Sequence, residues 1–264
     1  MSNDLIVEKN NQTLKLTMNR PERRNALSDD MLNKMLEELN KASFDNSIRA
    51  IVLTGSENAF CAGGDVKDMA SRDEDANKNV QQRTRDLRRV METARLLHQI
   101  TTPTIALIPG PAAGAGFSLA LACDIRIASE KSEFSEAFVS RGLIPADGSC
   151  WQLPRLIGSS NTFLLQYTGD RISAAEAHSM GIVSKIYDDQ EMMDKSIDLA
   201  CRIAEGPSQS HSITKYLIQQ GMHSNFSDHL DVARIAQDHM RQTEDHKEAV
   251  QAFLEKRKPI FKNQ

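Results

Sequence analysis

Two glycines precede an acid in the segment Phe60-Cys-Ala-Gly-Gly-Asp65, which follows the strand-like run 49–54. Glycine permits backbone conformations that are closed to other residues, so the amide of Gly64 could point into a cleft. Asp65 is placed to cap a short helix over residues 66–69. Taken alone, however, this segment is more typical of an ordinary glycine-rich turn than of a site.

A second segment, Gly110-Pro-Ala-Ala-Gly-Ala-Gly116, consists of small residues and leads into an apolar helix. The amides at a helix N-terminus can bind an anion. The segment lacks the third glycine and the later acid of a dinucleotide fingerprint, which excludes that function. Ser118 is one residue short of the G-x-S-x-G nucleophile pattern, so a serine hydrolase using Asp147 with His178 or His211 is an alternative. The match is weak, and a small polar residue on a helix is the more ordinary interpretation of Ser118.

A third segment, Gly142-Leu-Ile-Pro-Ala-Asp-Gly-Ser-Cys-Trp151, places an acid after an apolar stretch. Burial there would raise the pKa of the Asp147 carboxyl, because desolvation disfavours its charged form. The alternative is that Asp147 caps a helix that begins near Ser149. The local sequence favours both interpretations equally.

The composition is that of an ordinary globular protein, with 264 residues, 40% hydrophobic and 26% charged. The net charge of −4 argues against a nucleic-acid partner. No apolar run approaches the roughly 18 residues of a membrane span, and residues 1–10 do not resemble a signal peptide. The four cysteines form no C-x-x-C pair, so we expect no metal site. These features predict a cytoplasmic protein.

Strand-like and helical patterns alternate along the first three-quarters of the chain, which indicates an α/β fold with right-handed crossovers. The N-terminal region predicts a hairpin, and Ser28 is expected to cap the helix that follows it. The expected strands are 4–9, 12–18, 49–54, 104–108, 124–127 and 182–187; the expected helices are 28–43, 80–100, 117–123, one from about 149, one from 173 to 181, and four after 189. The pattern divides the chain into a core over 1–190 and a helical region over 191–264.

The three segments, together with Leu16-Thr-Met-Asn-Arg-Pro21 and Phe253-Leu-Glu-Lys256, resemble the enoyl-CoA hydratase/isomerase (crotonase) superfamily. The motifs are collinear and extend over essentially the whole chain. The resemblance implies a spiral of ββα units with a helical C-terminal region used in trimerisation, and hence a homotrimer or homohexamer. It also implies an acyl-CoA substrate, with no further cofactor because the CoA arrives as part of the substrate.

The resemblance assigns roles to individual residues. The amides of Gly64 and Ala115 would form an oxyanion hole, which stabilises the negative oxygen of a thioester enolate. The implied substrate and CoA contacts are Arg24, Ala26, Ala62, Asp65, Lys67, Phe138, Trp151, Phe253 and Lys256. Of these, Phe253 and Lys256 match residues that close over the CoA, commonly from a neighbouring subunit.

The chain also departs from the family pattern. Family hydratases carry two glutamates at the positions of Ser118 and Phe138, whereas isomerases carry a single acid in the loop that holds Asp147. Some members have that acid one residue earlier, at the position of Ala146, and Glu136 is the nearest other acid. We therefore predict double-bond isomerisation of an enoyl-CoA, with Asp147 as the acid and base. Hydration of a 2-enoyl-CoA is the close alternative, and a catalytically silent acyl-CoA-binding protein is a remote one.

Overall fold

A six-stranded sheet lies at the centre of the protein, in the order β1-β2-β3-β4-β6-β9. The computed structural model describes residues 3–65 and 80–263, without the side chains of 80–86. The strands of this sheet are β1 (Leu5–Asn10), β2 (Thr13–Met18), β3 (Ala50–Gly55), β4 (Thr104–Ile108), β6 (Ile125–Ser129) and β9 (Lys185–Tyr187). The expected hairpin is confirmed: β1 and β2 are antiparallel, and every later pair in the sheet is parallel.

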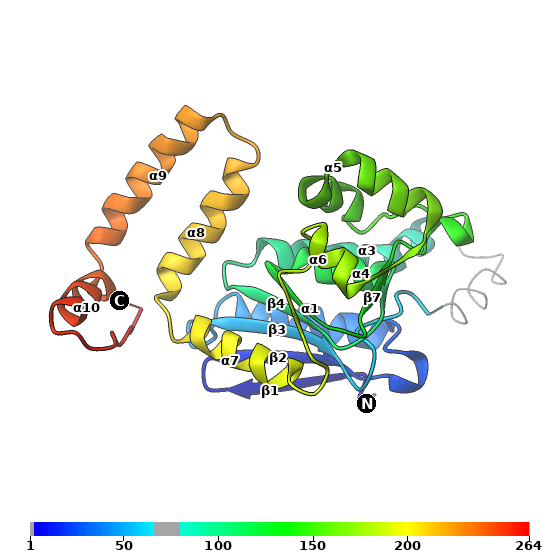
Figure 1. Ribbon diagram of the computed structural model, residues 1–264, viewed down its shortest axis with the longest axis horizontal. Helices are drawn as coiled ribbons and strands as arrows, with labels where there is room; N and C mark the ends of the chain where they lie inside the picture. Colours follow the sequence, from blue (N-terminus) through cyan, green and yellow to red (C-terminus); the bar gives the residue numbers. More distant parts are fainter. Residues whose placement is uncertain (1–2, 66–79, 264) are drawn as a thin grey trace.

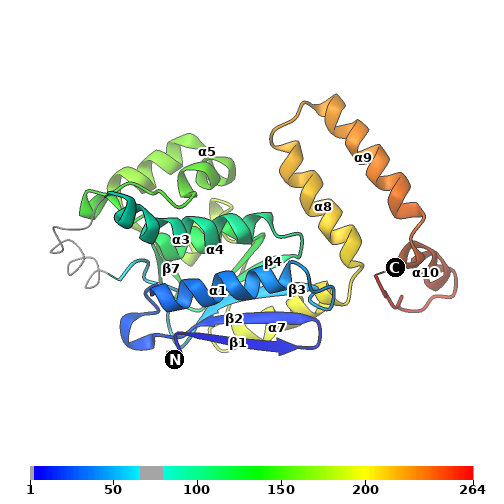
Figure 2. The same ribbon diagram turned by 180° about the vertical axis from the view of Figure 1, so that it is seen from behind.

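Alternate residues of the central strands enter two different cores. On β3, Ile51 and Leu53 join the core formed with α1 (Asp29–Ala42) and α3 (Val80–Gln99), while Val52 packs with α7 (Met192–Ala204). Figures 1 and 2 show α1 and α3 on one side of the sheet and α7 on the other. Because both faces are covered, these strands are nearly continuous apolar runs, as is typical of parallel sheets.

Local sequence signals define two of the helix starts as expected. The Ser28 hydroxyl accepts a hydrogen bond from the Met31 amide at 3.2 Å and begins α1. Ser173 and Glu176 form the reciprocal capping box that begins α6 (Ala174–Ser179). Each of these helices therefore begins where the sequence places a hydroxyl side chain before a helical pattern.

A second, three-stranded sheet was not predicted. It consists of β5 (Ala112–Ala113), β7 (Glu133–Ser135) and β8 (Arg171–Ser173), in that order. Strands of two or three residues are too short to show an alternating pattern. Around this sheet lie α4 (Ala115–Ala122), α5 (Ser149–Thr168) and the short 3-10 helices η1 (Pro21–Arg23) and η2 (Val139–Arg141).

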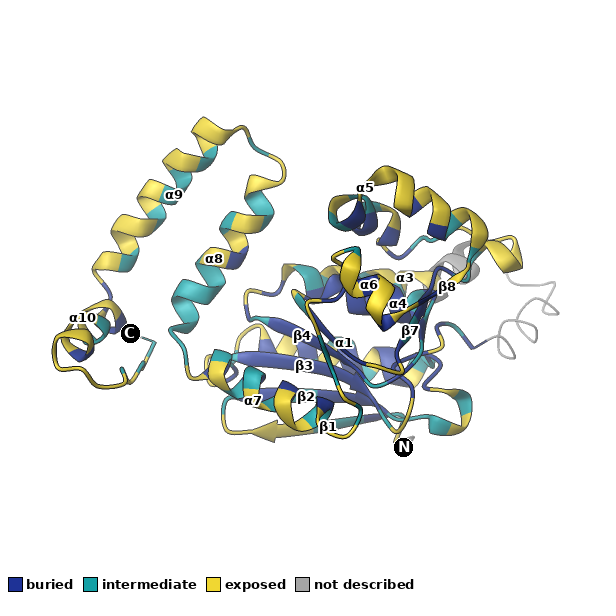
Figure 3. Cartoon of the chain, in the orientation of Figure 1, coloured by how far each residue is buried: buried dark blue, intermediate teal, exposed yellow. Residues whose placement is uncertain are grey.

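The last three helices, α8 (Ser208–Gly221), α9 (Phe226–Arg241) and α10 (Glu244–Leu254), extend away from the sheet (Figure 1). The four helical stretches expected after residue 189 are thus present, but α7 packs on the sheet and α8 to α10 project from it. Figure 3 shows α9 and α10 as mostly exposed and α8 as mostly of intermediate burial. Lys215 of α8 attaches to the core through Asp124, at 2.9 Å. Among the described residues, no helix combines the length and apolar character of a membrane span.

Candidate active site

The two glycine-bearing segments lie side by side, although about 50 residues separate them in the chain. The Ala113 amide donates to the Cys61 carbonyl at 2.9 Å. Glycine is required at two positions of this contact. A Cβ at Gly116 would lie 2.4 Å from the Cys61 carbonyl oxygen, and one at Gly63 would lie 2.7 Å from the Ala113 oxygen. The close approach of the two backbones brings Gly63 against the amide of Ala115.

The amides of Gly64 and Ala115 are the predicted oxyanion hole. Ala115 is the first residue of α4, where a helical amide has no acceptor within its own helix. Within the described part of the chain, neither amide donates a hydrogen bond to another residue. The positive end of the α4 dipole adds to the attraction for a negative oxygen. The arrangement therefore suits stabilisation of an oxyanion, and this role remains a prediction.

One turn further along α4, the hydroxyl of Ser118 donates to Asp147 Oδ1 at 2.7 Å. Both side chains are buried, with Asp147 4% exposed. Burial raises the pKa of the Asp147 carboxyl, while the hydrogen bond from Ser118 and those from the amides of Asp147 and Ser149 lower it. The N-cap residue of α5 is Gly148 rather than Asp147, but the Asp147 carboxylate accepts a hydrogen bond from the amide of Ser149, the first residue of the helix.

The serine-hydrolase arrangement is not assembled here. The Ser118 hydroxyl donates to Asp147 Oδ1 at 2.7 Å and lies 3.3 Å from the Gly114 carbonyl oxygen. The ring nitrogen Nδ1 of His178 lies 2.8 Å from the Val183 carbonyl oxygen. Within the described residues no histidine is hydrogen-bonded to Ser118, as a serine–histidine–acid triad would require. The geometry therefore favours Ser118 as a residue that tunes Asp147.

We expect Ser118→Ala to retain most of its activity and to shift the pH profile. Losing this hydrogen bond removes stabilisation of the ionised carboxylate and should raise the pKa of Asp147. Because the base acts when ionised, the acidic limb of kcat/KM should move to higher pH. Ser140→Ala, at an exposed serine of η2, is the control. A loss of several orders of magnitude at every pH would restore the nucleophile hypothesis.

A second acid, Glu136, lies near Asp147 and is 1% exposed. Its Oε2 accepts a hydrogen bond from the Ser149 hydroxyl at 2.9 Å. Burial, helped by the charge of Asp147, raises the pKa of Glu136 to about 8 against the hydrogen bonds from Ser149 and Gln166. Sequence reasoning could not orient this residue, because the strand that precedes it, β7, is three residues long.

The two predicted aromatic contacts lie in different surroundings. A Cβ at Gly114 would lie 3.6 Å from the ring of Phe138, so that ring covers the turn that precedes Ala115. Trp151 makes ring contacts with His98 and His223, at centroid distances of 5.3 and 5.6 Å. The ring of Trp151 therefore contacts α3 and the turn between α8 and α9, and its role toward the substrate remains a prediction.

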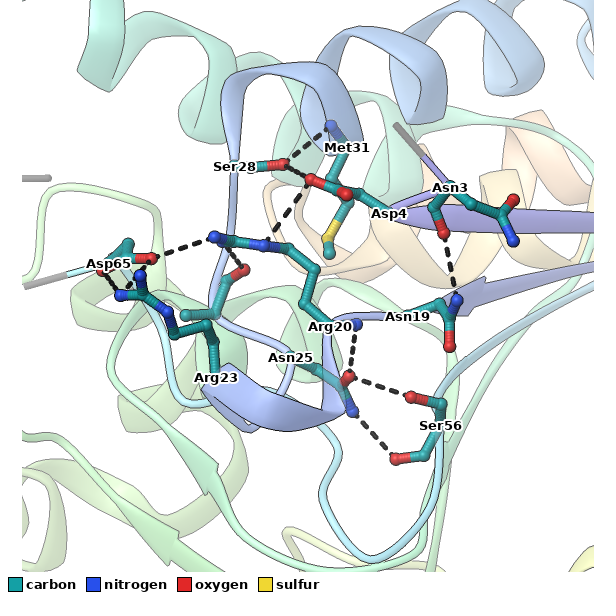
Figure 4. A network of polar contacts seen from close by, with 11 residues as sticks. Asn3, Asp4, Asn19, Arg20, Arg23, Asn25, Ser28, Met31, Ser56 and Asp65 are labelled. Atoms are coloured by element: carbon teal, nitrogen blue, oxygen red, sulfur yellow. Dashed lines mark hydrogen bonds and ion pairs between the residues drawn. The ribbon is translucent and has the colours of Figure 1, made fainter. Parts of the chain in front are cut away.

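The segment expected to line the CoA path is held by an ionic network that the sequence did not reveal (Figure 4). Arg20 and Arg23 contact the buried Asp65 carboxylate at 3.1 and 3.3 Å. Asp65 is thus an internal anion that Arg20 and Arg23 neutralise. The amide of Ala62 donates to the carbonyl of Arg24 at 3.0 Å, which joins the segment after Pro21 to the oxyanion loop.

The turn at Arg24 and Asn25 has an unusual backbone. Both residues have positive φ, 49° and 57°, which costs energy for a residue with a side chain. The buried Asn25 side chain stabilises the turn: its Nδ2 donates to the carbonyls of Ser56 and Ala59 at 3.0 and 2.8 Å. Ala26, buried next to it, precedes Leu27, whose amide donates to the carbonyl of Gly63 at 2.8 Å. Predicted residues from both segments are therefore brought together.

Three residues that were predicted to contact the substrate or CoA are not seen at this site within a single chain. Phe253, 82% exposed, and Lys256 lie at the end of α10, on the far side of the molecule from α5 (Figure 1). Lys67 lies outside the described residues. In the ranges 3–65 and 80–263, no three His, Cys, Asp or Glu side chains are grouped as metal ligands.

Comparison with known proteins identifies the family. The enoyl-CoA hydratase/isomerase family model matches residues 8–264. The chain belongs to the enoyl-CoA hydratase/isomerase family. It is 36% identical to the enoyl-CoA hydratase/isomerase YngF of Bacillus subtilis, over 98% of this chain and 97% of that protein. It is also 36% identical to the 1,2-epoxyphenylacetyl-CoA isomerase of Escherichia coli, over 97% and 96%.

A solved structure confirms the fold. The enoyl-CoA hydratase of Bacillus anthracis superimposes with a TM-score of 0.93 at 32% identity, covering 99% of this chain and 100% of that one. The protein is therefore an enzyme of the crotonase superfamily. The family contains both hydratases and isomerases by name, so the reaction must be argued from the site.

Proposed function

We propose that this enzyme shifts a carbon–carbon double bond in an enoyl-CoA, with Asp147 as the single acid and base. One observation carries the proposal: the buried Asp147 carboxylate is fixed by Ser118, one turn after the amide of Ala115 on the same helix. The base and one donor of the oxyanion hole are therefore held by one rigid element. This is the preorganisation that an enolate mechanism requires.

The proposed reaction balances with one carboxylate. Asp147 removes a proton from C2 of a 3-enoyl-CoA, and the electron pair moves toward the thioester oxygen to give a dienolate. The amides of Gly64 and Ala115 stabilise the charge on that oxygen. The same carboxyl then returns the proton to C4, which gives the conjugated 2-enoyl-CoA and regenerates the base.

Hydration is the second candidate, because Glu136 gives the pocket a second carboxyl. Adding water to a double bond requires groups that activate the water and protonate the carbon. The side chains at the two positions where family hydratases carry glutamates, Ser118 and Phe138, do not supply such groups. Isomerisation therefore makes fuller use of the groups that are present.

A panel of CoA esters tests the proposed reaction. With a 3-enoyl-CoA, the expected result is growth of the absorbance of the conjugated 2-enoyl thioester. With a 2-enoyl-CoA in water, that absorbance should persist. Loss of the 2-enoyl absorbance without turnover of the 3-enoyl ester would select the hydratase, and no turnover of either would contradict both.

We also propose that the protein is a trimer or hexamer that binds CoA with help from a neighbouring α10. Large apolar side chains are exposed on the projecting helices, as is typical of surfaces that are covered by a partner. They include Tyr216, Ile218, Met222, Phe226, Leu230, Ile235, Val250, Phe253 and Leu254.

We expect the mass from light scattering at micromolar concentration to be three or six times that of the chain. Ile235→Asp, which would place a charge within this apolar surface, should give smaller species. Asp231→Ser, at an exposed polar position of α9, should not. A monomeric parent would contradict the proposed assembly.

A further inference from the structure

Glu136 is a buried acid that the proposed reaction does not use. Its Oε2 accepts from Ser149, while its Oε1 is buried and has no hydrogen-bond partner in the described part of the chain. If the carboxylate were ionised, leaving one of its oxygens buried without a hydrogen-bond partner would cost a large amount of free energy. A neutral carboxylic acid meets the same surroundings at much lower cost, with its proton on Oε1 and its carbonyl oxygen facing Ser149.

The charges around Glu136 point in the same direction. Asp147 lies on the loop before α5, and Cys150 on α5 is the other titratable group whose pKa responds to both acids. The neighbours from α4 and α5 that bond to the two acids, Ser118, Ser149 and Gln166, are uncharged. In the described ranges, neither acid forms an ion pair with a lysine or arginine. Two adjacent carboxyls without a cation do not both ionise readily.

We propose that Glu136 is a positioning residue that stays protonated at neutral pH, holds Ser149 beside Asp147, and limits the pocket to one negative charge. Ser149 connects the two acids, because its hydroxyl bonds to Glu136 and its amide stabilises the charged form of Asp147. This inference rests on the proposed function in one respect, namely that Asp147 is the reacting base. The protonation of Glu136 itself does not depend on the reaction.

A protonated Glu136 affects the pH profile of turnover. Because the pKa of Glu136 is raised to about 8, most of Glu136 is neutral at pH 7 and adds no charge beside Asp147. Above pH 8, Glu136 loses its proton and places a negative charge beside Asp147. This charge repels the developing enolate and needs water to solvate it. Turnover should therefore fall on the alkaline side as Glu136 loses its proton.

Glu136→Gln tests this consequence, because glutamine has the shape of the neutral acid but cannot ionise. The variant should match the parent within about twofold at pH 7, where most of Glu136 is protonated, and exceed it on the order of tenfold at pH 9. Equal alkaline limbs in the two proteins would overturn the proposal. Inactivity of the folded variant at every pH would overturn it too, since Glu136 would then be a reacting group.

A stability measurement gives a readout that does not need turnover. An acid whose pKa is raised by folding stabilises the protein below its unfolded pKa, and that contribution is lost as pH rises through the folded value. For Glu136 the window runs from about 4.5 to about 8. The melting temperature of Glu136→Gln relative to the parent should therefore increase across this window and level off above it.

Glu133→Gln is the matched control, because Glu133 is on the same region of chain but 46% exposed at its side chain. The difference in melting temperature between this variant and the parent should show no step between pH 6 and pH 9. A constant difference in melting temperature between Glu136→Gln and the parent across the window from about pH 4.5 to about pH 8 would overturn the proposal. If the stability step appears and no CoA ester is turned over, Glu136 is protonated as proposed and the proposed reaction is wrong.

Discussion

Asp147→Asn is expected to lower kcat for the 3-enoyl-CoA reaction by about 10²–10⁴, the range that a positioned acid or base contributes. The change keeps the shape of the side chain and an oxygen for the Ser118 hydroxyl, which donates to Asp147 Oδ1 at 2.7 Å. It removes the basic site that takes the proton. The measurements are kcat and, separately, the affinity for a non-reacting CoA ester, which should change little.

The same variant should not lose stability. Burial raises the pKa of the Asp147 carboxyl in the folded protein, so keeping it ionised at neutral pH costs free energy of folding. An amide avoids that cost, and the melting temperature at pH 7 should be equal to or above that of the parent. A stable variant with normal turnover would show that the base lies elsewhere. A variant with a lower melting temperature would instead indicate a structural role for the carboxylate.

Much of the fold could be predicted because its signals are local. The Ser28 cap and the Ser173–Glu176 capping box each lie within a few residues of the helix they begin. The parallel strands β3 and β4 are apolar runs of six and five residues, long enough to be recognised. The short strand β7 and its neighbours carry no such signal, and their pairing is defined by contacts between segments distant in the chain.

The parts of the candidate site whose backbone is fixed by a motif could be predicted. The contacts between side chains that are distant in the sequence could not. The glycines at 63 and 116 follow from the close approach of two segments, and the motif implied that approach. The contacts of Arg20 and Arg23 with Asp65 join residues 45 and 42 positions apart, and nothing in the local sequence pairs them. The direction of Glu136 depended on a bend after β7, which the alternation of residues does not describe.

Ala115→Pro gives the second large effect expected, because it removes one amide of the proposed oxyanion hole and leaves the helix able to form. Ala115 is the first residue of α4, the position where proline is best tolerated. Gly114, which precedes it, has φ 49° and ψ −125°, and this is the mirror image of the extended backbone that a residue before proline prefers. The variant should therefore fold, with a melting temperature close to that of the parent.

Losing one such donor costs about 10²–10³ in kcat. The proline ring also occupies space where the thioester oxygen would approach, so the kcat of the variant should be lowered by at least that factor. Ala115→Gly is the matched control: it keeps the amide, and it should retain turnover while losing some helix stability. A folded proline variant with near-normal turnover would place the oxyanion outside the pair Gly64 and Ala115. A loss in the glycine control as large as in the proline variant would trace the effect to the helix rather than to the amide.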